Sequence, residues 1–358
     1  MLSIATILIA LFGLVLLITL HELGHFLMAR YFNVKVDEFG IGIPPRVWGK
    51  QVGETLYSIN LLPLGGFVRL EGEDSSVKGP RSFSEKPVAQ RLAIVAAGVV
   101  MFWIISAVIF TGLALTSGIP SAVPDDMRNV NKPMVRVFSV VPDSPAFEAG
   151  ILPGDIIMEV GGAPVTTVDQ LIFEVESKKG KETSIITKRG RNVEEITLVP
   201  RVQHKEGALG VQLGRVALVK SLWWEAPLRG IELTADMTWR IVGAFGTVVA
   251  SLLPGREMPD GVSIMGPIGI VSALQDSLFL GIPHFLFFLS LLSLHLAVIN
   301  ILPIPALDGG RIAFLLVEGA RGKAAPEQVE KVIHTAFFIL LILLLLFITI
   351  QDISSLFS

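Results

Sequence analysis

The chain lacks cysteine and carries little charge. Without cysteine it can form neither a disulfide nor a thiolate metal site, so a metal ion would have to be bound by His, Asp, Glu or water. Only 17% of its 358 residues are charged, against about 25% in an ordinary soluble domain, and 51% are hydrophobic. The net charge of -3 is too small to indicate a nucleic-acid partner. This composition predicts several segments in a lipid bilayer and a smaller soluble part.

The first twenty residues contain no Lys or Arg, and no small-residue cleavage site follows them, so we do not interpret them as a cleaved signal peptide. They begin the first of four apolar runs, each close to the roughly 20 residues that a membrane helix needs. The runs, at about 2–30, 88–117, 282–302 and 332–350, predict four transmembrane helices. Residues 223–253 carry charges at helical spacing, which favours an amphipathic helix at the membrane surface over a fifth span.

The distribution of basic residues predicts how the chain is oriented in the membrane. Lys and Arg are frequent in 30–91 and in 311–331, whereas the spans at the two chain ends have none at their outer sides. Because short cytoplasmic loops carry an excess of Lys and Arg, both basic loops are predicted to be cytoplasmic. Both termini and the segment 119–281 are then expected outside the cytoplasm.

Residues 119–204 have the pattern of a small soluble domain inserted between the second and third spans. Short strand-like runs separated by glycine turns surround a helix-like stretch at 166–180. The order S-P-A-x-x-A-G-x-x-x-G-D-x-I at 144–157 resembles PDZ domains of bacterial proteases. Such domains bind an extended peptide along a sheet edge, so we expect a peptide or protein ligand, with a structural spacer as the alternative. Residues 208–216 predict a strand that leads back to the membrane.

The motif H-E-L-G-H lies near the end of the first apolar run. In a helix, His21 and His25 are one turn apart on one face and can bind one zinc ion. Glu22 can hydrogen-bond a water molecule on the metal and act as general base. The alternative is a polar helix end packed against a neighbour, but ionisable groups within a membrane are costly and rarely lack a function.

Two histidines leave zinc short of a protein ligand, and Asp308 in N-I-L-P-I-P-A-L-D-G-G-R-I is the best candidate for it. Pro303 and Pro305 break the third span, and irregular backbone is tolerated at membrane depth where it is buried or lines a watery cavity. Gly309 and Gly310 allow a close approach to another helix. A site of two histidines, one aspartate and water is therefore predicted. Asp308 could also serve as the N-cap of the next helix, and the two roles are compatible.

Together these motifs resemble the site-2 protease family, in particular the bacterial branch that cleaves membrane-bound anti-sigma factors. H-E-L-G-H in the first span, N-x-x-P-x-x-x-L-D-G-G in the third and a PDZ domain between them all match. So do G-P-I-G-I at 266–270 and E-G-A-R-G-K at 318–323. The stretch L-L-P-L-G-G-F-V-R-L-E-G-E-D at 61–74 resembles the membrane-associated β-hairpin of that branch. The match extends over nearly the whole chain.

The resemblance implies a polytopic α-helical membrane protein with four transmembrane helices, an inserted α+β PDZ domain and a membrane-associated β-hairpin. It implies an intramembrane zinc endopeptidase of the bacterial inner membrane. The expected substrates are single-span membrane proteins, either anti-sigma factors or signal-peptide remnants, which are cleaved in their transmembrane segments during regulated intramembrane proteolysis.

The resemblance also assigns roles to individual residues. The implied zinc ligands are His21, His25 and Asp308, with one ion per chain. Glu22 is the implied catalytic base. Asn300 is expected near the substrate backbone. Gly65 and Gly66 are expected in a strand that pairs with an extended substrate.

The predicted division of the chain has four parts. They are an N-terminal membrane half at 1–118, the PDZ domain with its linker at 119–204, an amphipathic membrane-surface segment at 205–281 and a C-terminal membrane half at 282–358. One position departs from the family pattern, which commonly has an asparagine in the second span shortly after A-A-G. This chain has Phe102 there.

An alternative function is a non-proteolytic membrane module, in which the PDZ domain recruits partners and the metal is structural. Glu22 favours the protease, because a structural site needs ligands but no base. A metal transporter is disfavoured, because only one cluster of potential ligands is present and no pathway of polar residues accompanies it.

Overall fold

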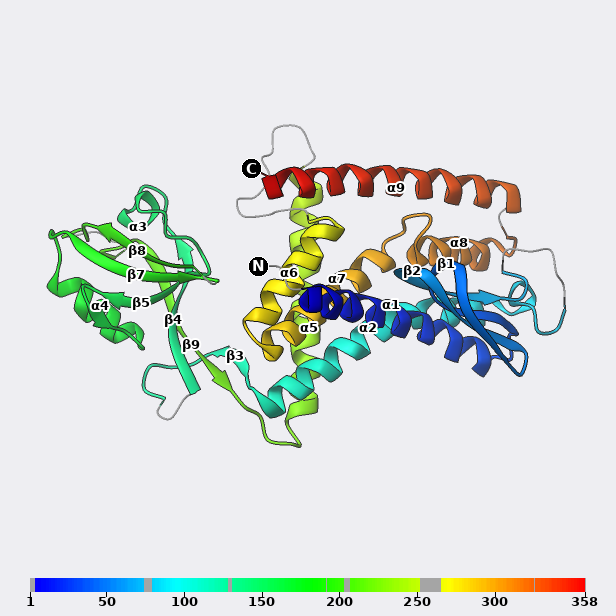
Figure 1. The fold of residues 1–358 in the computed structure, drawn as a ribbon, viewed down its shortest axis with the longest axis horizontal. Helices are drawn as coiled ribbons and strands as arrows, with labels where there is room; N and C mark the ends of the chain where they lie inside the picture. The colour runs from blue at the N-terminus through cyan, green and yellow to red at the C-terminus, as the bar shows by residue number, and fades with distance from the viewer. Residues whose placement is uncertain are drawn as a thin grey trace. The chain divides into compact units, whose positions relative to one another are not determined.

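The chain folds into two compact units, which are described separately. Figure 1 shows the computed structural model, which describes residues 4–73, 79–127, 131–190, 192–202, 207–251, 265–324 and 326–357. The helical unit comprises Met1–Thr111 and Pro227–Ser358, and the PDZ-like unit comprises Gly112–Ala226. The ends of the segments predicted at 61–74 and 223–253, and the predicted boundary at 204, lie outside the described residues.

Four helices are long and apolar enough to cross a membrane, by length and composition over the described residues. They are α1 (Ile4–Tyr31), α2 (Val88–Thr116), α7 (Ile282–Ile301) and α9 (Glu327–Phe357). Each covers most of one of the four predicted apolar runs, as expected where lipid forces the backbone to satisfy its hydrogen bonds within a helix. A short 3₁₀ helix, Phe83–Glu85, precedes α2, and α8 (Asp308–Arg321) lies between α7 and α9.

The apolar core of the helical unit lies where α1, α2, α7 and α6 (Pro267–Phe279) meet. Leu274 of α6 is fully buried in the same cluster as Ala10 and Phe285. The structure differs here from the prediction of a membrane-surface segment over 205–281. The apolar face of α6 is buried against α1 and α7, so this part belongs to the interior of the unit.

α5 (Ala226–Ser251) accounts for most of the predicted amphipathic helix and is not among the four apolar helices. The start of α5 packs closely on the later part of α2, because a Cβ added to Gly230 would lie 2.2 Å from Thr111 Oγ1. The large side chains of Leu228 and Trp239 are exposed. A helix that combines exposed apolar residues with charged ones suits a membrane surface, and that location stays a prediction.

A two-stranded antiparallel sheet follows α1 and consists of β1 (Val36–Val52) and β2 (Thr55–Leu70). Residues 38–41 each have one partner in 56–59 and a second in 66–69, so the first part of β1 lies between two stretches of β2. In the part of the chain that the structure describes, no other strand pairs with 66–70, which forms an outer edge. The hairpin is therefore longer than the sequence predicted, because the 61–74 stretch supplies only the second part of β2, 61–70, and none of β1. Its membrane association stays a prediction.

The PDZ-like unit is built on one sheet with the strand order β3-β9-β4-β5-β7-β8, and β6 pairs with β5 (Figure 1). The strands are β3 (Ile119–Ala122), β4 (Asn131–Val140), β5 (Ile156–Val160), β6 (Ala163–Pro164), β7 (Thr183–Arg189), β8 (Asn192–Leu198) and β9 (Val211–Val219). The helices are α3 (Pro145–Glu148) and α4 (Val168–Ser177). The unit has its own apolar core, which includes Val137, Leu171 and Ile185.

The extent of this unit differs from the prediction at its C-terminal side. β9 pairs with both β3 and β4, so the strand that the sequence places on the way back to the membrane lies within the sheet. The unit therefore continues to Ala226. The strand's own sequence could not reveal this, because its pairing partners come from distant parts of the chain.

The G-D pair of the PDZ signature has a clear structural role. Asp155 is buried and accepts hydrogen bonds from Leu152 N at 2.9 Å and from Arg189 Nε at 2.7 Å. Burial raises the pKa of Asp155, but the guanidinium of Arg189 and the backbone amide outweigh burial and hold this pKa below its ordinary value. The charged pair thereby ties the turn before β5 to β7.

Candidate metal centre

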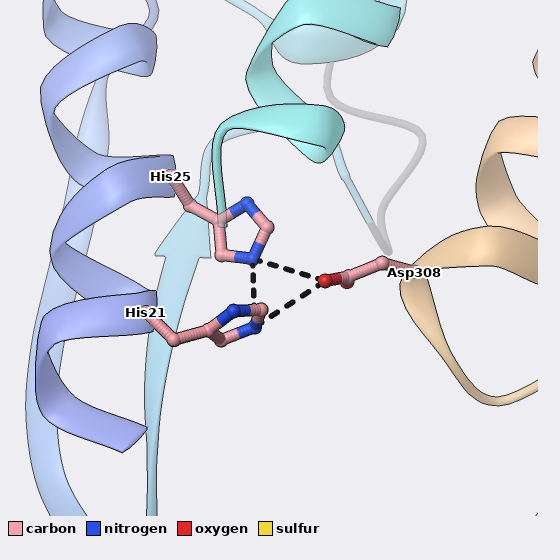
Figure 2. Close-up of side chains that lie close together, drawn as sticks. All are labelled: His21, His25 and Asp308. Atoms are coloured by element: carbon pink, nitrogen blue, oxygen red, sulfur yellow. Dashed lines mark hydrogen bonds and ion pairs between the residues drawn. The ribbon is translucent and has the colours of Figure 1, made fainter. Parts of the chain in front are cut away.

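Three potential metal ligands meet inside the helical unit (Figure 2). His21 and His25 come from successive turns of α1, and Asp308 is the first residue of α8. The two Nε2 atoms are 3.2 Å apart, and Asp308 Oδ2 lies 3.3 Å from His21 Nε2 and 3.5 Å from His25 Nε2. The helical spacing of the H-E-L-G-H motif directs both imidazoles to the same point, as the sequence predicts.

Glycines bring α1 and α2 close together at the histidines. A Cβ added to Gly24 of α1 would lie 2.5 Å from the carbonyl oxygen of Ala97. A Cβ added to Gly98 of α2 would lie 2.2 Å from His25 Nε2 and 2.6 Å from His21 Cε1. Small residues allow such close approach between helices in membranes. Both imidazoles therefore lie directly against the backbone of α2.

The two histidines differ in the surroundings of their second ring nitrogen. His25 Nδ1 is 2.9 Å from the carbonyl oxygen of Ile94, so a proton on Nδ1 leaves Nε2 free to bind a metal. His21 Nδ1 is buried, and no described residue forms a hydrogen bond with it. The ring of His21 is instead stacked on Phe102, with centroids 4.5 Å apart and an interplanar angle of 18°.

Asp308 is presented by an irregular turn between α7 and α8. Ala306 has a positive φ of 79°, and its amide donates a 2.9 Å hydrogen bond to His334 Nδ1 of α9. A Cβ added to Gly309 would lie 2.0 Å from the carbonyl oxygen of Leu302, so the chain folds back tightly on itself here.

A cavity of about 350 Å³ opens beside the three ligands. Its walls come from α1, the outer edge of β2, α2 and the start of α8. The lining residues are Glu22, His25, Phe67, Val68, Arg69, Leu70, Glu73, Ile94, Val95, Asp308 and Arg311. Glu22 thus shares one cavity with two of the three ligands, although it is not itself part of the ligand cluster.

The arrangement fits a tetrahedral metal ion. Zinc binds His nitrogen and carboxylate oxygen at about 2.0–2.2 Å, which corresponds to ligand atoms separated by roughly 3.3–3.6 Å in a tetrahedron. The three observed separations of 3.2, 3.3 and 3.5 Å lie at or near this range. Two imidazoles and one carboxylate are the donor types that zinc prefers when thiolates are absent.

The other predicted site residues, Gly65, Gly66 and Asn300, lie at different distances from the candidate base and its cavity. Gly66 lies against the candidate base, since a Cβ at Gly66 would be 3.2 Å from Glu22 Cγ. Gly65 has a positive φ of 147°, which few residues other than glycine adopt. Asn300 is partly buried near the end of α7, and it is not among the residues that line the cavity.

The fold and the site define a class: a membrane-embedded metalloprotease with an H-E-x-x-H helix and an aspartate ligand from a second helical segment. The family model for peptidase family M50 matches residues 9–344, so the chain belongs to this family and is a multi-pass intramembrane zinc metalloprotease of the site-2 type.

Similar proteins come from several bacteria. A Clostridium perfringens protein provisionally named a zinc metalloprotease is 33% identical and covers 97% of this chain and 98% of its own length. Regulator of sigma-W protease RasP from Bacillus subtilis is 28% identical, over 95% of this chain and 96% of its own. A solved PDZ domain of an SdrC-like protein from Listeria innocua is 34% identical, covers 22% of this chain and 92% of that chain, and has a TM-score of 0.20.

Sequence reasoning missed the contribution of α2 to the site. Ile94, Gly98 and Phe102 are spaced four residues apart, so they form one face of α2, and all three contact the histidines. The only available signal was a glycine within an apolar span, which indicates a close helix contact without naming the partner. Phe102 stands out only as a departure from the family pattern.

Proposed function

We propose that this chain hydrolyses a peptide bond within the transmembrane segment of a single-span membrane protein, in regulated intramembrane proteolysis. The observation that carries the proposal is the cavity that Glu22 shares with His25, Asp308 and the outer edge of β2. This cavity lies in the unit that contains α1, α7, α9 and all but the last turn of α2. The Bacillus subtilis relative is named as a protease that regulates sigma-W, which supports a substrate of the anti-sigma-factor type. Signal-peptide remnants are a second proposed substrate class, which rests on the family resemblance.

In this proposal His21, His25 and Asp308 hold one zinc ion. When bound, zinc supplies a Lewis acid that polarises the scissile carbonyl and lowers the pKa of water to about 7. Glu22 takes the proton from the attacking water and delivers it to the nitrogen of the leaving peptide segment. The presence of Glu22 in the cavity, outside the cluster of ligands, supports this role.

The outer edge of β2 is proposed to receive the substrate in extended form. A helical transmembrane segment conceals its carbonyl groups, so it has to unwind before cleavage. The backbone of 66–70 has no strand partner on its outer side among the described residues, and such an edge can pair with an extended peptide. Because Gly66 lies against Glu22, a peptide paired at Gly65 and Gly66 would pass close to the base. The role of Asn300 stays a prediction from the family resemblance.

The proposed location is the bacterial inner membrane, with both termini and the PDZ-like unit outside the cytoplasm. Basic residues in 30–91 and 311–331 support this orientation. The PDZ-like unit is proposed to bind a peptide or protein segment, and its own core supports an independent binding module. A non-proteolytic module with a structural metal remains the competing function, and the position of Glu22 in the cavity, outside the cluster of potential ligands, argues against it.

Replacing Glu22 with glutamine tests the proposal. Glu22→Gln keeps the size of the side chain but removes the proton acceptor, so cleavage of a membrane-embedded test substrate should fall by about 10²–10⁴. Zinc content should stay at the wild-type level, measured by metal analysis of the purified protein. Asp308→Ala is the matched control, which should lose zinc together with activity. Unchanged cleavage by Glu22→Gln would refute the proposed mechanism.

A further inference from the structure

The two histidines of the metal centre are held by α2 in different ways. His25 has a polar partner, the carbonyl of Ile94, 2.9 Å from Nδ1. His21 has no such partner within the described part of the chain, where its buried Nδ1 forms no hydrogen bond. The ring of Phe102 lies nearly parallel to His21, at a centroid distance of 4.5 Å. A metal-binding histidine usually donates its second N–H to an acceptor, which fixes the orientation of the ring. Another contact must therefore fix the orientation of the His21 ring.

Phe102 is itself well fixed, which allows it to act as a support. Its side chain is 2% exposed and belongs to the core cluster shared by α1, α2, α6 and α7. Its backbone carbonyl accepts hydrogen bonds from Ser293 Oγ of α7 at 2.9 Å and from Ser106 Oγ at 3.0 Å. Rotation of the His21 ring about its Cβ–Cγ bond would drive a ring edge into this fixed aromatic face.

We propose that Phe102 is a positioning residue that sets the plane of the His21 imidazole by stacking, in place of the missing hydrogen bond at Nδ1. The inference rests on the proposed metal site. It explains how a chain with Phe102, at the position where the family resemblance leads us to expect asparagine, keeps both histidines directed to one point. Stacking restrains the plane of the ring, but the phenyl ring offers no carbonyl acceptor to Nδ1. The supporting interaction of His21 is therefore apolar, whereas that of His25 is polar.

The test compares two buried phenylalanines of the same helix. Phe102→Leu removes the aromatic face beside His21, and Phe102→Met fills a similar volume with a flexible chain in case the leucine variant folds poorly. Phe110→Leu is the matched control, since Phe110 is fully buried and its ring packs near Phe287, with centroids 5.5 Å apart. The full-length proteins are stripped of metal, and Co²⁺ binding is measured by the visible spectrum and by competition with a chromophoric chelator.

Loss of an outer support of a ligand typically weakens metal binding by about 10–100-fold. We expect Phe102→Leu and Phe102→Met to raise the dissociation constant for Co²⁺ by at least about tenfold and to change the shape of the visible spectrum. Phe110→Leu should leave both unchanged. Equal behaviour of the Phe102 and Phe110 variants, with Co²⁺ bound as in the wild type, would overturn the role of Phe102 alone. If His21→Ala binds Co²⁺ as tightly as the wild type, the proposed metal site fails and this inference fails with it.

Discussion

The two sides of the metal centre are held in place by different forces. The histidine side depends on close packing, because Gly24 and Gly98 bring the backbones of α1 and α2 together and leave no space for a side chain. The aspartate side depends on polar contacts at the ends of several segments. The ligands are only 3.3 and 3.5 Å apart across this boundary, yet packing between two helices dominates on one side and polar contacts between several segments dominate on the other.

Three polar contacts attach the aspartate side to the rest of the helical unit. Arg91 of α2 forms a bidentate ion pair with Glu318 of α8, at 2.5 and 3.0 Å. Arg311, three residues after Asp308, pairs with Glu73, which follows β2. The third contact is the hydrogen bond from the Ala306 amide to His334 of α9.

This difference indicates which side of the site can change its position. Close-packed backbones cannot shift without a clash or a void, and either is costly. Ion pairs and hydrogen bonds can be exchanged for contacts with water or a ligand at a smaller net cost. The most apolar stretch of α9 has none of its residues buried, so this helix adds little apolar packing. We therefore expect adjustments that admit a substrate to occur on the aspartate side.

Gly98→Ala should have the largest effect, because it acts on the close-packed side. The added methyl group would lie 2.2 Å from His25 Nε2, so α1 and α2 have to separate or both imidazoles have to turn away. A displacement of 1 Å at a catalytic group can cost about 100-fold in rate. Proteolysis should fall by about 100-fold or more, and zinc content, measured by metal analysis, should fall with it.

Gly112→Ala is the control for this prediction, because it makes the same substitution in the same helix. Apart from the adjoining backbone of its own helix, no heavy atom of the described residues lies within 4 Å of the added Cβ. It should leave zinc binding and activity unchanged. If Gly98→Ala is as active as Gly112→Ala, the histidine side tolerates movement and the contrast between the two sides is wrong.

The ligands themselves were predictable because their signals are local. H-E-L-G-H needs only a helix to bring His21 and His25 together, and the proline-broken stretch before Asp308 marks a polar turn in an apolar run. The supports of the ligands were not predictable, because they depend on which helix faces which. Lipid-facing and protein-facing residues are both apolar, so hydropathy alone could not show that Phe102 faces His21.

The fold was predictable to a similar degree. The four apolar runs correspond to α1, α2, α7 and α9, and the strands and helix expected within 119–204 are present. The burial of α6 and the place of β9 in the sheet depend on contacts between distant segments. The spacing of apolar residues within one segment does not identify such partners. Figure 1 shows β9 beside β4 in that sheet.

Arg91→Met should have an intermediate effect, because it leaves Glu318 without its partner. The two side chains are 12% and 19% exposed, so the remaining carboxylate is largely desolvated. Loss of one member of a buried ion pair costs about 3–5 kcal/mol, and partial exposure favours the lower end of this range. Denaturant unfolding in detergent should therefore show a loss of about 3 kcal/mol. Zinc should bind more weakly, because α8 loses its tie to α2.

The control for Arg91 is Arg240→Met, which breaks an exposed pair with Asp236 in α5. The side chains of that pair are 69% and 51% exposed, so its loss should cost at most about 1 kcal/mol. A stability loss for Arg91→Met as small as that for Arg240→Met would mean that the ion pair does not hold the aspartate side.

The smallest effect is expected at His334, whose contacts include a hydrogen bond from the Ala306 amide and a long pair with the exposed carboxylate of Glu330 at 3.8 Å. His334→Phe keeps a ring beside Phe314 but removes the acceptor for the Ala306 amide, two residues before Asp308. An unsatisfied amide costs about 1–3 kcal/mol, and access of water at the turn favours the lower end. Zinc affinity should therefore fall roughly fivefold, since each 1.4 kcal/mol corresponds to about tenfold.

His334→Asn separates the hydrogen bond from the packing of the ring. The asparagine side-chain oxygen can occupy the place of Nδ1 and accept from the Ala306 amide, although the ring contact with Phe314 is lost. Amide hydrogen exchange at 302–310 should be faster than wild type in His334→Phe and close to wild type in His334→Asn, with zinc affinity following the same order. Faster exchange in both variants would assign the effect to ring packing, so that the aspartate side would be held by packing as the histidine side is.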